Sequence, residues 1–230
     1  MAPSSPNSSN PMLIGIDWGS SNLRAALLDA QGTLIDRRES AAGVFTIKDG
    51  DFSTALLSLC GDWVAQYRVP VLACGMIGSK QGIVEVPYVA CPAGVHDLAR
   101  QLVRIEVLPK PESTGMRAFD LFIVPGLKTG SHANGWDVIR GEETQLFGVQ
   151  LAPDSLAILP GTHSKWMTQG HGGAIANFQT YMTGELFELL RSHGSLARVM
   201  ANSQWSPEAY QQGVHDARDD ALENLSLIHI

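Results

Sequence analysis

The chain has 230 residues, of which 44% are hydrophobic and 17% charged, and it carries a formal net charge of −7 at pH 7. This composition is typical of a globular protein, and its acidic balance offers no basic field that would attract nucleic acid or an anionic membrane. A small anionic substrate would therefore need a local basic pocket. The three cysteines, Cys60, Cys74 and Cys91, cannot all pair and have no C-x-x-C spacing, which is typical of reduced thiols in a cytoplasmic protein.

The N-terminal segment, residues 1–11, is rich in Ser, Pro and Asn, and we expect it to be a disordered tail. It has neither the basic region nor the apolar stretch of a signal peptide. No apolar run approaches the ~20 residues that a membrane-spanning helix needs, so a membrane partner is not expected.

A first domain is expected at residues 12–154. Short apolar runs bounded by turn residues predict five strands, at 12–17, 23–29, 33–40, 69–74 and 119–124. Between Phe52 and Tyr67 the apolar residues recur at helical spacing, which predicts a helix. Residues 75–94 resemble a loop rich in Gly and Pro, residues 95–103 are weakly helical, and a helix is predicted at 137–150.

A second domain is expected at residues 155–230. Its predicted strands are 156–159, 165–168 and 174–180, and a helix is predicted at 183–190. Ser206 begins the last helix, because it is a good cap, Pro207 occupies the first helical position and Glu208 places an acid in the first turn.

The same order of elements occurs twice: strand, turn, strand, hairpin, strand, helix, first at 12–67 and again at 156–190. The two turns contain small or hydroxyl-bearing residues, Gly19, Ser20, Ser21 and Asn22 in the first and Gly161, Thr162, His163 and Ser164 in the second. Chance is an alternative, since such meanders are common. Two facing turns of this kind could hold a polyphosphate through their backbone amides, and Asp17 could hold Mg²⁺ directly or through water.

Six segments carry a resemblance to known sugar kinases. Residues Gly15–Arg24 are similar to the first phosphate-binding motif of the sugar kinases related to actin and hexokinase. The others resemble the 2-dehydro-3-deoxygalactonokinase family: Cys74–Gly82, Tyr88–Gly94, Arg140–Gln145, Leu159–Trp166 and Phe178–Phe187. One such motif alone would be weak, whereas these segments follow the family's order from about Leu13 to Phe187.

The resemblance implies an α/β fold of two ribonuclease-H-like lobes, the actin-like ATPase fold, at residues 12–154 and 155–230. It implies phosphorylation of the C6 hydroxyl of 2-dehydro-3-deoxy-D-galactonate, a small sugar acid of galactonate breakdown, with ATP and Mg²⁺ in the cleft. We expect the second lobe to be incomplete, because the family completes it with further elements that include the adenine-holding segment. The alternatives are a kinase for another sugar or sugar acid and a non-catalytic sugar-binding relative.

The resemblance also implies roles for acidic residues. Asp17 would position Mg²⁺ on the nucleotide phosphates, although a strand-end aspartate can also simply satisfy turn amides. In related kinases an acid before the second phosphate turn orients the attacking hydroxyl. Glu142 and Glu143 occupy this place, and we prefer Glu143, although paired glutamates are also common on solvated helix faces. Lys165 follows the second turn and could point toward the phosphates or away from them.

The carboxylate of the implied substrate needs a cation or a set of amides. Candidates are Lys80, Arg24 and Arg140, since arginine favours bidentate carboxylate binding. A structural ion pair is an equally open interpretation for both arginines. Gly75, Gly78 and Gln81 belong to a loop whose backbone would face the substrate, and the loop lacks the spacing of a Walker motif.

Overall fold

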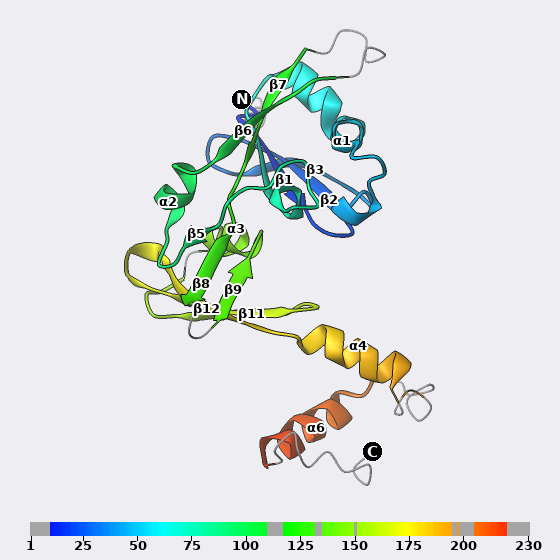
Figure 1. Ribbon diagram of the computed structural model, residues 1–230, viewed down its shortest axis with the longest axis vertical. Coiled ribbons are helices and arrows are strands. Elements are labelled where there is room, and N and C mark those ends of the chain that lie inside the picture. Colours follow the sequence, from blue (N-terminus) through cyan, green and yellow to red (C-terminus); the bar gives the residue numbers. More distant parts are fainter. Residues whose placement is uncertain are drawn as a thin grey trace, which may run out of the picture. The chain divides into compact units, whose positions relative to one another are not determined.

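The computed structural model describes residues 10–109, 117–131, 135–149, 151–194, 197 and 205–219 (Figure 1). Its contacts divide the chain into two units, Met1–Thr183 and Gly184–Ile230, which are treated separately below. Most of the expected tail at 1–11 lies outside the described residues. Within them, no helix is long and apolar enough to cross a membrane.

A six-stranded mixed sheet is the framework of the first unit (Figure 1). Its strands are β1 (Leu13–Trp18), β2 (Leu23–Leu28), β3 (Leu34–Ser40), β4 (Val71–Gly75), β6 (Val103–Val107) and β7 (Phe119–Ile123). They lie in the order β3-β2-β1-β4-β7-β6. β1, β4 and β7 are parallel to one another, whereas β2, β3 and β6 run antiparallel to their neighbours. The fold is therefore α/β, as the sequence predicts.

Helix α1 (Phe52–Tyr67) packs on one face of this sheet. Asp51 caps the helix, because its side chain accepts a hydrogen bond from the amide of Thr54 at 3.3 Å. Alternate residues of β1 are buried toward the helix, and the core between them includes Ile14, Ile16, Trp18, Leu23, Leu27, Leu56, Trp63, Leu121 and Ile123. Each large side chain buried here stabilises the fold by about 1.5–3 kcal/mol.

The loop that follows β3 is hydrogen-bonded to the turn between β1 and β2. It includes the short helix η1 (Val44–Thr46). Three backbone hydrogen bonds join loop and turn, from Gly43 N to Ser21 O (3.0 Å), Val44 N to Gly19 O (2.9 Å) and Phe45 N to Ser20 O (3.1 Å). The indole Nε1 of Trp18 also donates to Ala42 O at 2.8 Å. Because the carbonyls of the turn accept hydrogen bonds from the amides of this loop, the loop fixes the conformation of the turn.

Two smaller sheets form the rest of the first unit (Figure 1). One contains β5 (Val89–Ala90), β8 (Leu127–Ser131) and β9 (Gly135–Ile139), and the other β10 (Leu156–Leu159), β11 (Ser164–Gln169) and β12 (Ile175–Tyr181). They share a second core that includes Leu127, Ile139, Leu146, Met167, Ile175 and Phe178. Asp137 of β9 joins them, because its carboxylate accepts from the amide (2.6 Å) and the hydroxyl (2.7 Å) of Thr180 on β12.

Short helices connect these strands. They are η2 (Met76–Gly78), α2 (Val95–Ala99), α3 (Glu142–Phe147) and η3 (His171–Gly173). Helix α4 (Thr183–His193) starts at the last residue of the first unit, and α6 (Pro207–Asp219) belongs to the second. The hydroxyl of Ser206 accepts from the amide of Ala209 at 3.2 Å, so the predicted cap of the last helix is confirmed.

The structure corrects two predictions of secondary structure. The helix predicted at 137–150 is wrong at its start, because residues 135–139 pair with β8 as β9 and α3 begins only after Gly141. The weak helix at 95–103 ends at Ala99, and β6 begins at Val103. The domain boundary predicted at 154/155 stays a prediction. The contacts group the residues up to Thr183 into one unit, in which β10–β12 share a core with the sheet of β5, β8 and β9.

Gly43 offers a test of the loop that holds the β1–β2 turn. A Cβ atom at Gly43 would lie 2.2 Å from the carbonyl carbon of Ser21 and 2.3 Å from the oxygen of Ser20. We predict that Gly43→Ala lowers the free energy of unfolding by about 1–3 kcal/mol, as overpacking does. Gly15→Ala is the control, since its Cβ would meet nothing closer than 3.9 Å. Equal denaturant midpoints for the two variants would contradict the contact.

Candidate active site

A row of polar residues crosses the ends of four neighbouring strands. The pairing register places Asp17 of β1 opposite Arg24 of β2 and Cys74 of β4, and Arg24 opposite Glu39 of β3. Arg24 Nη1 donates to Asp17 Oδ2 at 3.3 Å, and Arg24 Nε donates to Glu39 Oε1 at 2.9 Å. We call Glu39, Arg24 and Asp17 the charged row. Arg24 is thus in an ion pair with both acids.

The start of α3 lies against the ends of β1 and β4. A Cβ atom at Gly75 would lie 2.7 Å from Trp18 O, and one at Gly141 would lie 3.2 Å from the Cα of Gly75. Both glycines also have positive φ angles, +91° and +112°. Only residues without a side chain allow these three segments to approach so closely.

Glu143 is fully buried at this junction. Its two carboxylate oxygens accept from the amide of Gly141 at 2.9 and 2.8 Å, and Oε1 also accepts from the hydroxyl of Thr144 at 3.0 Å. Burial raises the pKa of Glu143 from 4.5 to about 7, against the opposing effect of these hydrogen bonds. A carboxylate with such a pKa changes its charge near neutral pH.

Glu142 differs from its neighbour in exposure. It is half-buried, and its Oε2 accepts from the amide of Arg140 at 2.9 Å. Both glutamates therefore bind backbone amides at the start of α3, but Glu143 alone lies within the packed interior.

The thiol of Cys74 is affected by the charges of both Asp17 and Glu143. Its pKa is raised to about 12, mainly by burial and then by the charges of Asp17 and Glu143. Asp17, Cys74 and Glu143 therefore share one electrostatic environment. A cavity of about 620 Å³ opens beside them, with Asp17, Arg24, Cys74 and Thr144 among its lining residues.

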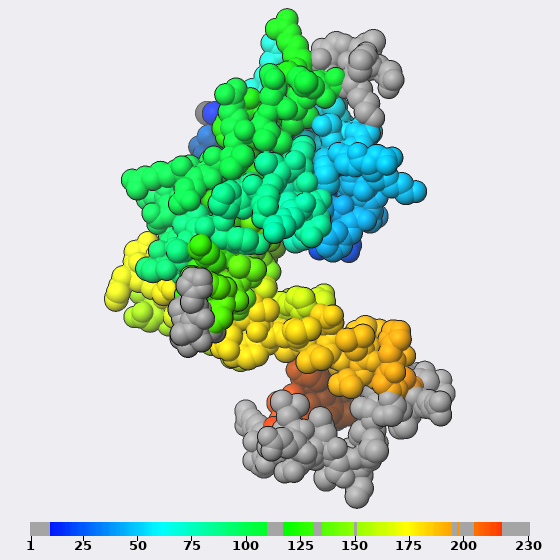
Figure 2. Space-filling model, in the orientation of Figure 1, coloured from blue at the N-terminus to red at the C-terminus, as the bar shows by residue number. Residues whose placement is uncertain are grey.

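Arg140 is packed inside the loop that follows β4. Its guanidinium carbon lies 4.2 Å from the centre of the Tyr88 ring, and Nη2 donates to Val86 O at 2.7 Å. A Cβ atom at Gly78 would lie 2.9 Å from Nη1. The Nε and Nη1 atoms are buried and have no hydrogen-bond partner, so this arginine keeps unused donors. Figure 2 shows the loop as part of the surface of the first unit.

The other predicted residues of this loop are less involved. Lys80 is exposed. Gln81 is also exposed, and its Oε1 lies 3.2 Å from the hydroxyl of Ser79, which also donates to Met76 O. These contacts hold the loop together, and they bring neither Lys80 nor Gln81 to the charged row.

The second predicted phosphate turn lies between β10 and β11, with Gly161, Thr162 and His163 exposed. Ser164 is buried and shares a hydrogen bond with the hydroxyl of Thr183. Lys165 is also buried, and its Nζ donates to Thr180 Oγ1 at 2.8 Å and to Val138 O at 3.3 Å. The structure therefore shows Lys165 joining β11 to β12 and β9, one of the two orientations left open.

Both predicted phosphate turns contain backbone amides that donate to no backbone carbonyl of the described residues. Neither Ser20 N and Ser21 N in the first turn nor Gly161 N and Thr162 N in the second donates to a backbone carbonyl within the described residues. Glycine and free amides at such turns can bind phosphate oxygens.

The arrangement fits a magnesium ion only as a partner of phosphates. Among the described residues, no three His, Cys, Asp or Glu side chains form a metal-binding group. Mg²⁺ commonly needs just one or two carboxylates when phosphates supply further ligands. The side chain of Asp17 is 35% exposed, so its carboxylate is accessible to an ion and suits this role.

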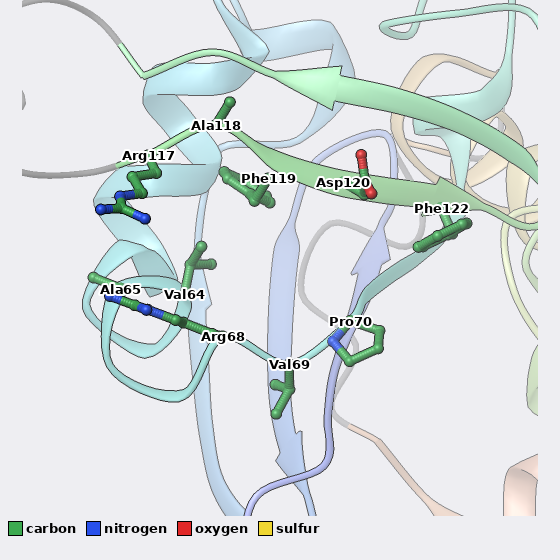
Figure 3. A pocket seen from close by; sticks show the side chains of 10 residues that line it. All are labelled: Val64, Ala65, Arg68, Val69, Pro70, Arg117, Ala118, Phe119, Asp120 and Phe122. Carbon is green, nitrogen blue, oxygen red and sulfur yellow. The ribbon is translucent and has the colours of Figure 1, made fainter.

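A separate cavity of about 520 Å³ lies at the other end of the parallel strands (Figure 3). It is lined by the end of α1, by the two residues that precede β4 and by residues that precede or belong to β7. Figure 3 shows Arg68 and Arg117 extending to the same side of it. None of the predicted site residues lines this cavity, so it is not part of the candidate active site.

Sequence reasoning missed Glu39, Cys74 and Gly43. Glu39 and Cys74 enter the site through strand register, which needs the partner strand to be known. No local signal marks Gly43, since its role depends on the backbone of a turn more than twenty residues earlier.

The chain is similar to known proteins along most of its length. The family model described as 2-keto-3-deoxy-galactonokinase matches residues 17–228. The chain is 37% identical over 202 residues to 2-dehydro-3-deoxygalactonokinase of Escherichia coli (strain K12), covering 87% of the chain and 64% of that relative. It is 33% identical over 191 residues to a probable 2-dehydro-3-deoxygalactonokinase of Rhizobium meliloti (strain 1021), covering 82% and 59%.

A solved structure is also similar. It is the crystal structure of a Sinorhizobium meliloti protein described under the same enzyme name, and it matches with a TM-score of 0.76 and 32% identity. The match covers 90% of the chain and 67% of that structure. The chain thus spans less than two thirds of the length of the two curated relatives.

The buried carboxyl group of Glu143 predicts a pH dependence of stability. Its pKa is higher in the folded protein, about 7, than the ordinary 4.5, so folding favours the protonated form. The stabilisation is complete below pH 4.5 and is lost as the pH rises through 7, by up to roughly 3 kcal/mol. We predict that Glu143→Gln removes this loss in urea unfolding between pH 5 and 8, whereas Glu142→Gln keeps it. Parallel profiles for Glu143→Gln and the unmodified protein would contradict the burial of a titrating group.

Proposed function

The chain belongs to the 2-keto-3-deoxy-galactonokinase family, and on this premise we propose that the full-length protein phosphorylates the C6 hydroxyl of 2-dehydro-3-deoxy-D-galactonate with ATP. The observation that carries the proposal is the family match over residues 17–228, which includes the acidic cluster of Asp17, Glu142 and Glu143. The three free cysteines are in keeping with a cytoplasmic enzyme.

Phosphoryl transfer is mainly positioning and charge stabilisation, so the proposal assigns these tasks to particular groups. The amides of the turns at 19–22 and 161–164 would bind the phosphates of ATP, and Asp17 would hold Mg²⁺ on them. Bound ATP would supply the phosphoryl group, and Mg²⁺ would neutralise the charge that develops on it during transfer. The ammonium group of Lys165 is bound to Thr180 and Val138. The turn amides are therefore better placed than Lys165 to donate hydrogen bonds to the phosphates.

A carboxylate must orient the attacking hydroxyl and accept its proton. We assign this task to Glu143, because a pKa of about 7 suits proton exchange near neutral pH. Its burial means that the substrate would reach it only after a local rearrangement, as happens when kinase lobes close. Glu142 is the alternative, since it is more exposed and lies on the same turn of α3.

Arg140 is our candidate for the carboxylate of the substrate. Its Nε and Nη1 atoms have no partner, and a guanidinium can bind a carboxylate with two parallel hydrogen bonds. Gly78 lies directly beside Nη1, so the loop has room there only for a hydrogen atom. Arg24 is less suitable for binding the substrate carboxylate, because it already forms ion pairs with Asp17 and Glu39.

The substrate assignment predicts the outcome of a kinase assay over a panel of sugars. Full-length protein should convert ATP to ADP with 2-dehydro-3-deoxygalactonate and, more weakly, with closely related keto-acids. Hexoses without a carboxylate should be poor substrates, because they leave Arg140 unpaired. Faster turnover of neutral hexoses would refute the assignment, and preference for another sugar acid would move the activity to that substrate.

The acidic cluster predicts different effects for its members. Asp17→Asn should raise the Mg·ATP concentration needed for half-maximal rate. Glu143→Gln should lower kcat by about 10²–10⁴-fold with little change in nucleotide affinity, the usual range for proton-transfer groups. Glu142→Gln is the matched control on the same helix. Near-normal turnover in Glu143→Gln together with a collapse in Glu142→Gln would transfer the role to Glu142.

A further inference from the structure

The charged row places one arginine between two carboxylates. In the strand register Arg24 has Asp17 on one side and Glu39 on the other. The contact to Glu39 is shorter, 2.9 Å from Nε, than the contact to Asp17, 3.3 Å from Nη1. Arg24 therefore binds both carboxylates, and its shorter contact is with Glu39.

The position of Arg24 matters for any cation at Asp17. An arginine bound to Asp17 alone would occupy a carboxylate oxygen and would place its positive charge beside the metal ion, which it would repel. Glu39 compensates this charge and competes with Asp17 for the guanidinium. A divalent cation at Asp17 then meets a nearly neutral pair of side chains instead of a competing cation.

We propose that Glu39 is a positioning residue that sets the affinity of Asp17 for a nucleotide-bound divalent cation by holding Arg24 back. This inference rests on the proposed function in one respect, the role of Asp17 as the holder of Mg²⁺. Glu39 needs no contact with substrate or nucleotide for this purpose. Its effect passes through Arg24, and this dependence can be measured.

The molecule contains a matched control for the change of charge. Asp62 of α1 pairs with Arg38, the neighbour of Glu39 on β3, with 2.7 Å between Asp62 Oδ2 and Arg38 Nη2. Asp62→Asn and Glu39→Gln each remove one negative charge from an arginine ion pair. Successive residues of a strand point to opposite faces of the sheet, so the Arg38 pair does not reach Asp17.

The experiment measures binding of Mn²⁺ to the protein in the presence of ADP, by the loss of the electron paramagnetic resonance signal of free Mn²⁺. We expect Glu39→Gln to weaken Mn²⁺ binding by about two- to fivefold, the range of ion pairs at protein surfaces, and Asp62→Asn to leave it unchanged. Arg24→Gln should tighten binding. The double variant Glu39→Gln/Arg24→Gln should bind like Arg24→Gln alone, because Glu39 then has nothing to hold. Circular dichroism checks that each variant is folded.

Three results would overturn the inference. Equal Mn²⁺ affinities for Glu39→Gln and Asp62→Asn would show that Glu39 has no special effect. Weaker binding in Arg24→Gln would show that Arg24 contacts the nucleotide phosphates instead of opposing the metal. Unchanged binding in Asp17→Asn would remove the metal role from the proposed function as well. If Asp17→Asn loses Mn²⁺ while Glu39→Gln resembles Asp62→Asn, only the role of Glu39 is wrong.

Discussion

The close approach of three backbone segments is the constraint on which the candidate site depends. β1 ends beside β4, and the start of α3 packs on both, at separations that only Gly75 and Gly141 permit. This approach buries Glu143, brings Cys74 between two acids and leaves the carboxylate of Asp17 partly open. A side chain at either glycine would push the segments apart, and the acids would no longer share one environment.

The two acids of the site lie in different surroundings. Glu143 lies in the interior, where burial opposes its charge and a few backbone and hydroxyl donors offset part of that cost. Asp17 is partly exposed and is paired with Arg24. In the proposed function these two carboxylates have different tasks, since one would exchange a proton near neutral pH and the other would hold a cation.

The elements with strong local patterns were predictable from the sequence. The strands and helix of residues 12–67 and the β10–β12 meander have clear apolar periods and turn residues, and the structure contains them. Residues 137–139 were misassigned to a helix because Trp136 and Val138 are exposed on this strand, which does not resemble a buried apolar run. Asp17 and the two glutamates could be identified through motifs. The pairing of Arg24 with Glu39 and the hold of Gly43 on the first turn depend on tertiary contacts and could not.

The hold on the first turn also limits how the chain can vary in length. The backbone bonds of residues 43–45 to residues 19–21 fix the register of these two segments, because a residue added or deleted within either of them would shift the donors away from their acceptors. The next exposed turn, at Asp49 and Gly50, has positive φ angles and no such partner bonds to the first turn. Insertions that distinguish members of the family should therefore accumulate at residues 48–50 and at the tip of the β2–β3 hairpin, residues 30–32. They should be absent from the bonded segments themselves, residues 19–21 and 43–45.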